Sequence, residues 1–254
     1  MNMPDEDYAY FQTKFPLSAA GPACTVEHVN TYKGLVPDAL IAYWQEFGFS
    51  GFGDGIVWFV DPIEWKATAE LLLDGLRHPQ LPEDAQFIPI ARSAFGKVWF
   101  WTPGYGITLI LEPADGTAFP RALQASRPNS DLDSAVQAFF SGGAKKDRFD
   151  FLDNSEEYMF DRVSKRLGPL QFDQVYGFAP GIVLGGPVVP ENTHLFEIHA
   201  HMALLRAAIA DREAFVAWLK TQDPDAPVSI KAFWADSAST LATPKPINGG
   251  WRTY

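Results

Sequence analysis

Residues 85–113 contain three apolar and aromatic runs that follow one another with very little chain between them. They read AQFIPIAR (85–92), GKVWFWTP (96–103) and GITLILEP (106–113). Each run is rich in the β-branched and aromatic residues that favour strands, and the short links between them carry Gly. Links of this length join strands that pair side by side in opposite directions. We therefore predict an antiparallel meander in the N-terminal half of the chain.

Helical patterns lie on both sides of these strands. Residues 34–48 (GLVPDALIAYWQEFG) carry an apolar stripe made of Leu40, Ile41, Trp44 and Phe47. Residues 61–76 begin with Asp61 as a candidate N-cap and Pro62 in the first turn. Further helices are predicted at 5–15, 25–32 and 129–143, and a further strand at 55–62. This order of helices and strands predicts an α+β domain.

The charged segment 144–155 has weak periodicity, and we place a domain boundary there. The prediction is an α+β domain over 1–145 with an antiparallel sheet, and a smaller, mainly helical α+β domain over 146–254. The second domain is expected to contain a helix at 155–169 capped by Ser155, a strand at 173–180, and one or two helices at 199–222. Asp211 is the expected cap of the second of these helices. From about residue 223 the chain is rich in Pro, Ser, Thr and Gly, which predicts an irregular tail.

The net charge of the chain is −11 at pH 7. Such a chain repels nucleic acid, so we expect no direct binding to DNA or RNA. The charge is uneven, because residues 1–145 hold 17 acidic and 9 basic residues while residues 146–254 hold 14 and 11. An acidic surface steers association with a basic partner. The N-terminal half is therefore the better candidate for binding one, although acidity also serves solubility alone.

Three loops of the N-terminal half carry acidic residues, and one of them also carries an aromatic residue. GFGDGIVWF places Phe52 and Asp54 on a tight loop, LPEDA contributes Glu83 and Asp84, and ADG contributes Asp115. Acidic loops around an aromatic anchor suit a protein that fills a basic cleft. We interpret these five residues as candidates for partner binding, and ordinary polar turns remain the alternative.

The segment FDQVYGFAPGIVLGG (172–186) contains four glycines, but its spacing does not fit a phosphate-binding loop. It lacks the G-x-G-x-x-G pattern, and Pro187 follows Gly186 where a phosphate loop has Lys and then Ser or Thr. We interpret it as turns and core, and we expect Gly185 to be needed for folding.

No other constellation supports catalysis. HLFEIHAH brings His194, His199 and His201 close in sequence, but a zinc site needs three or four converging ligands. Cys24 and His28 could approach one another on a helix, yet a lone cysteine is more often a small buried side chain. The sequence contains neither G-x-S-x-G nor H-E-x-x-H. We predict a protein without catalytic residues, metal or cofactor.

No apolar run approaches the roughly 20 residues that a membrane-spanning helix needs. The N-terminus MNMPDEDYAY lacks the basic and apolar regions of a secretory signal, and Cys24 is the only cysteine. We therefore expect a cytoplasmic protein without a membrane partner.

Two stretches resemble known families. GLVPDALIAYWQEFGFSGFGDGIVWFVDP followed by ARSAFGKVWFW resembles the GAD-like domain. DQVYGFAPGIVLGG followed by LFEIHAHMALLRAA resembles the C-terminal domain of the Tdi type VI secretion immunity proteins. Together they cover roughly residues 5–220. The resemblance implies a cytosolic immunity protein that binds a cognate DNase toxin stoichiometrically, by occluding its basic DNA-binding or active-site cleft. It carries over no catalytic residue.

Two other classes of function stay open at this point. The mixed α+β domain would also suit a small-molecule-binding protein or an enzyme of another kind, which would show a ligand-induced thermal shift without a protein partner. An intracellular scaffold is a further alternative. No oligomeric state is predicted.

Overall fold

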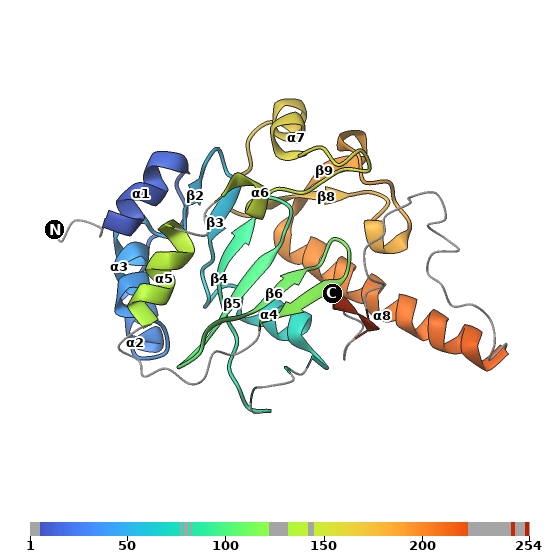
Figure 1. The fold of residues 1–254 in the computed structure, drawn as a ribbon, viewed down its shortest axis with the longest axis horizontal. Helices are drawn as coiled ribbons and strands as arrows, with labels where there is room; N and C mark the ends of the chain where they lie inside the picture. Colours follow the sequence, from blue (N-terminus) through green and yellow to red (C-terminus); the bar gives the residue numbers. More distant parts are fainter. Residues whose placement is uncertain are drawn as a thin grey trace.

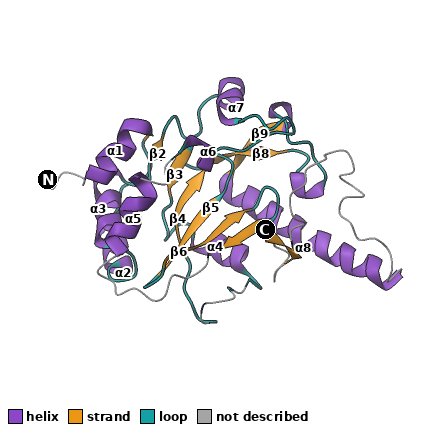
Figure 2. Cartoon of the chain, in the orientation of Figure 1, coloured by secondary structure: helices purple, strands orange, loops and turns teal. Residues whose placement is uncertain are grey.

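The structure is a computed structural model of the chain that describes residues 6–76, 78, 81, 83–121, 132–141, 145–222, 245–246 and 252–253, with side chains described up to residue 210. The helices are α1 (Glu6–Lys14), α2 (Val26–Tyr32), α3 (Asp38–Phe47), α4 (Lys66–Leu73), α5 (Leu132–Ser141), α6 (Lys146–Phe149), α7 (Phe160–Leu167) and α8 (Ile198–Gln222). The strands are β1 (Leu17–Ala19), β2 (Gly51–Phe52), β3 (Val57–Phe59), β4 (Ile88–Ser93), β5 (Val98–Thr102), β6 (Gly106–Glu112), β7 (Thr117–Pro120), β8 (Gln174–Phe178), β9 (Thr193–Glu197), β10 (Lys245–Pro246) and β11 (Arg252–Thr253). Figures 1 and 2 show their arrangement.

The larger sheet is an antiparallel meander. Strands β1 to β7 lie in sequence order, and each pairs antiparallel with the next. The three strands predicted in 85–113 are β4, β5 and β6, so that prediction is confirmed. The sheet continues beyond β7 through β11, which pairs with β7 in parallel, and then β10. A second, two-stranded sheet is formed by β8 and β9. The α+β class is therefore confirmed.

Both faces of the larger sheet are covered. Successive side chains of a strand point to opposite faces, and those of β5 divide in this way between two hydrophobic clusters: Trp99 and Trp101 belong to one, Val98 and Phe100 to the other. The first cluster lies under α1, α3 and α5, which pack together at one side of the sheet in Figure 1. The second lies under α4 and α8.

Each cluster takes residues from both sides of the boundary predicted at residue 145. The first contains Phe149, Phe160 and Tyr176 beside the aromatic side chains of α1 and α3. The second contains Ile198 and Met202 beside the residues of α4, β5 and β6. The division into 1–145 and 146–254 stays a prediction, but the packing between the two parts is core packing.

A buried arginine also joins the two parts. Arg92 on β4 is 1% exposed. Its guanidinium lies over the ring of Trp58 at 4.8 Å and donates a hydrogen bond of 2.7 Å to the carbonyl of Phe172. Burial lowers the pKa of Arg92 to about 9. The aromatic face and the carbonyl supply a setting in which an arginine is tolerated away from water.

Several predicted helix boundaries differ from the structure. Helix α7 begins at Phe160 rather than at Ser155, because the carboxylate of Asp150 accepts hydrogen bonds from the backbone N–H groups of Met159 and Phe160. Helix α8 continues through Asp211, so the predicted cap there is wrong. Asp61 does accept from the N–H groups of the next turn, but the regular helix α4 begins only at Lys66.

No helix in the described part of the chain combines the length and the apolar character needed to cross a bilayer.

The Lys97–Glu112 pair predicts a measurable dependence of stability on pH. Glu112 is 4% exposed and its carboxylate lies 2.9 Å from the Lys97 ammonium. Burial raises the pKa of Glu112 from 4.5 to about 7, against the lowering effect of Lys97. Between pH 4.5 and 7 the folded protein holds a proton that the unfolded chain has released, so its stability falls as pH rises through that window. The shift corresponds to about 3 kcal/mol.

We expect Glu112→Gln to remove this loss. Chemical denaturation at pH 4.5 and pH 8 should show the variant gaining about 3 kcal/mol on the wild type between the two conditions. A difference between the two proteins that stays constant with pH would contradict the burial argument.

Candidate partner-binding site

The structure places the four acidic candidates at two ends of the larger sheet. Val57 pairs with Ser93, and Val98 pairs with Leu111. The β2–β3 turn with Asp54 and the β6–β7 turn with Asp115 therefore lie at the same end, four strand spacings or about 19 Å apart. Glu83 and Asp84 precede β4 and lie at the opposite end. The four residues do not form one continuous surface.

The candidates also differ in exposure. Asp54, Glu83 and Asp84 are exposed, and Asp115 is half-buried. Phe52 is only 1% exposed: it lies in β2 and packs against Phe59 and Phe11, with ring centroids 5.1 and 5.5 Å away. Its side chain is core and does not form a surface anchor in this structure.

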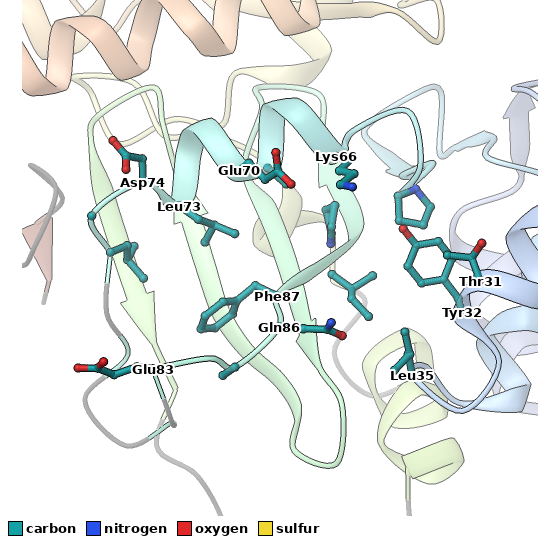
Figure 3. A pocket seen from close by; sticks show the side chains of 17 residues that line it. Thr31, Tyr32, Leu35, Lys66, Glu70, Leu73, Asp74, Glu83, Gln86 and Phe87 are labelled. Atoms are coloured by element: carbon teal, nitrogen blue, oxygen red, sulfur yellow. The ribbon is translucent and has the colours of Figure 1, made fainter.

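Glu83 lines a hollow that the sequence does not reveal. It has a volume of about 590 Å³ and lies between the C-terminal end of α2, one face of α4 and the segment 83–89 that leads into β4. We call it the α4 hollow. Figure 3 shows Leu73 and Phe87 pointing into it, with Asp74 and Glu83 on either side of them and Glu70 nearby. Toward the other end it is lined by the side chains of Tyr32, Leu35 and Lys66.

The two helical walls of the α4 hollow are tied to each other. His28 of α2 and Asp61, just before α4, are both buried, and the His28 Nε2 atom lies 3.0 Å from the Asp61 Oδ1 atom. The other ring nitrogen, Nδ1, accepts a hydrogen bond from the Thr25 backbone N–H at 3.0 Å. The same Asp61 oxygen accepts from the N–H of Ile63. This chain of hydrogen bonds fixes the start of α4 relative to α2.

Helix α8 holds α4 from the side away from the hollow. The His199 ring contacts the carboxylate of Glu64, and its Nδ1 atom lies 2.6 Å from the Thr68 hydroxyl. Arg206 donates a hydrogen bond of 2.9 Å to the backbone carbonyl of Asp74, directly after α4. A cation at this position satisfies one of the carbonyls left open at a helix end.

The geometry does not support a reactive Cys24–His28 pair. Both nitrogens of His28 are engaged, by Thr25 and by Asp61. Burial, followed by the negative charge of Asp61, raises the pKa of the Cys24 thiol, which keeps it protonated and weakly nucleophilic.

The three neighbouring histidines diverge in the fold. His194 is exposed on β9, and His199 contacts α4. His201 is buried beneath Phe196, with a ring separation of 4.4 Å, and burial lowers its pKa to about 4. Among the described residues no group of three or more His, Cys, Asp or Glu side chains is arranged to hold a metal ion.

The glycine-rich segment 172–186 consists mostly of turns and core, as predicted, but Leu184, which the pattern also assigns to the core, is 63% exposed. Val175, Tyr176, Ile182 and Val183 are buried. The N–H of Gly186 donates to the carbonyl of Gly181 at 2.9 Å, which closes a tight turn. The segment thus contains β8 and packs it against the rest of the fold.

Comparisons with known proteins assign families to both halves. Residues 6–114 match the GAD-like domain, and residues 133–207 match the family described as T6SS immunity protein Tdi1, C-terminal. A comparison with curated proteins found no match. The crystal structure of Atu4351 from Agrobacterium tumefaciens is similar in fold, with a TM-score of 0.69 and 24% identity over 78% of this chain and 87% of that one.

Proposed function

The chain joins a GAD-like domain to the C-terminal domain of the type VI secretion immunity protein Tdi1 and is thereby a Tdi-type immunity protein, and we propose that it neutralises a cognate DNase toxin by stoichiometric binding in the cytoplasm. The match of residues 133–207 carries this proposal. A guard against a DNase has to act where the DNA is, which favours the cytoplasm.

The charge of the protein supports a basic partner. A nuclease must attract the phosphate backbone, so its DNA-binding surface is basic. A protein of net charge −11 is attracted to the same surface and competes with DNA for it. Inhibition then follows from occupying the DNA-binding or active-site cleft, without any chemical step by the inhibitor.

Co-expression tests this proposal directly. The gene for the chain and the open reading frame beside it are expressed together and separately in the same cells. We expect the neighbouring product alone to degrade DNA and stop growth, and co-expression to restore growth and yield a complex that purifies at a fixed stoichiometry. Continued toxicity in the presence of the folded chain, or the absence of a complex, would contradict the proposal.

A salt series adds a second test of the mechanism. If acidic side chains meet a basic cleft, the association rate should fall steeply as ionic strength rises, because screening shortens the range of the attraction. Stopped-flow measurement of the association rate between 50 and 500 mM salt, in steps at roughly constant pH, follows this effect. An association rate independent of salt would indicate a contact without charge complementarity.

A further inference from the structure

We propose that the α4 hollow is a docking site for the toxin, and that its occupant is an arginine side chain of the toxin. The inference rests on the proposed function and assigns that binding to one place on the GAD-like domain. The aliphatic stem of the arginine would lie against Leu73 and Phe87, and its guanidinium would lie between Asp74 and Glu83 (Figure 3).

The floor of the hollow is apolar and incompletely covered. Leu73 and Phe87 pack against the second hydrophobic cluster but stay half-buried. Covering such side chains with the stem of a long amphipathic residue removes apolar area from water. A guanidinium also lies favourably on an aromatic face such as that of Phe87.

The rim selects a cation. Glu70, Asp74 and Glu83 are all exposed around the floor, and among the described residues that line the hollow Lys66 is the one cation. In the described part of the chain, Glu70 and Glu83 make no ion pair, and the carboxylate of Asp74 reaches Arg206 only at 4.0 Å. A cation that enters the hollow would meet these exposed carboxylates. Arginine suits two flanking carboxylates better than lysine does, because its planar group donates in several directions at once.

The walls of the hollow are fixed before any partner arrives. The His28–Asp61 hydrogen bond ties α2 to the start of α4, and Arg206 holds the carbonyl that follows its end. A site whose walls are already in place loses less entropy on binding than one that must be ordered. The Tdi1-type domain therefore contributes to this site through α8, although every residue that lines the hollow belongs to the GAD-like domain.

The test is a pair of double variants with equal charge. Glu70→Lys with Glu83→Lys reverses two carboxylates of the rim. Glu46→Lys with Glu191→Lys makes the same change at two exposed acids on α3 and beside β9. Both proteins carry a net charge four units more positive than the wild type. Thermal unfolding of each protein checks that both remain folded.

We expect the rim variant to bind the toxin about 100-fold or more weakly, mainly through faster dissociation, and the control variant to stay within about 3-fold of the wild type.

Phe87→Ala, measured in parallel, should weaken binding about 10-fold by removing the aromatic floor. Equal losses in the two double variants, or no loss in either, would overturn the assignment of the hollow while leaving the immunity function intact. A wild-type chain that fails to bind the toxin would instead refute the proposed function.

Discussion

Gly186→Ala is expected to destabilise the protein by about 3 kcal/mol or more and to abolish protection against the toxin. A Cβ atom at residue 186 would lie 1.9 Å from the carbonyl oxygen of Pro180 and 3.0 Å from that of Gly181. Both are backbone atoms, so no side-chain rotation relieves the clash. The turn closed by the Gly186 N–H and the Gly181 carbonyl, at 2.9 Å, has to open.

Gly185→Ala is the matched control. Gly185 has a φ of 94°, which strains any residue with a side chain, but nothing lies within 4 Å of its Cβ position. The expected cost is therefore about 1–2 kcal/mol, from backbone strain alone. Urea denaturation of both variants measures the difference. Equal stability of the two variants would show that the turn shifts to relieve most of the clash at residue 186.

These two glycines show what the sequence reveals about this segment and what it does not. Its composition and spacing are sufficient to reject a phosphate loop and to predict turns and core. The sequence predicts that Gly185 is needed for folding, whereas the structure places the tighter constraint on Gly186. The sequence does not reveal the constraint on Gly186 because it comes from the carbonyl of Pro180. That carbonyl lies beside residue 186 only in the folded turn.

Regular elements with strong local patterns could be predicted, and short ones could not. The apolar runs of β4, β5 and β6 are visible in the sequence because each run is long enough to show its strand character. Strands β1, β2 and β7 have two to four residues each, and their pairing is set by the neighbouring strand rather than by their own composition. The missed strand β9 likewise depends on its partner β8.

Of the five partner-binding candidates predicted from the sequence, only Glu83 lines the α4 hollow. Phe52 is predicted as an anchor because it stands between glycines, a pattern that suggests a turn. Pairing of β2 with β1 and β3 buries it. The apolar floor of the hollow comes from Leu73 and Phe87. Both are distant in sequence from α2, which forms another wall of the hollow. One local signal was available: three consecutive leucines, 71–73, cannot all face the core from one helix.

Separating the chain at the predicted boundary is expected to leave neither part stably folded. A fragment of residues 1–145 would lose the side chains of Val175, Val183, Ile198, Met202, Leu205 and Ile209, which fill the second hydrophobic cluster. Burying one such side chain contributes about 1.5–3 kcal/mol, so six together contribute about 9–18 kcal/mol. The whole stability of a typical domain is about 5–15 kcal/mol.

The fragment would also lose polar contacts that its own residues need. Arg92 would lose the carbonyl of Phe172, and the end of α4 would lose Arg206. We expect residues 1–145 alone to show no cooperative thermal transition, and the intact chain to unfold in a single one. Circular dichroism melts of the fragment, the intact chain and a mixture of both fragments make the comparison. Mixing 1–145 with 146–254 should restore a transition if the shared cores reassemble.

A stable, cooperatively folding 1–145 fragment would contradict the shared-core argument and would have a functional consequence. If such a fragment also bound the toxin with full affinity, the α4 hollow would not need α8 to hold its wall. If binding appeared only in the mixture, the reason would be physical: Thr68 and the carbonyl of Asp74 meet their α8 partners only when both parts are present. The second result is the one we expect, because α4 is the element that carries the rim of the hollow on one side and the packing of α8 on the other.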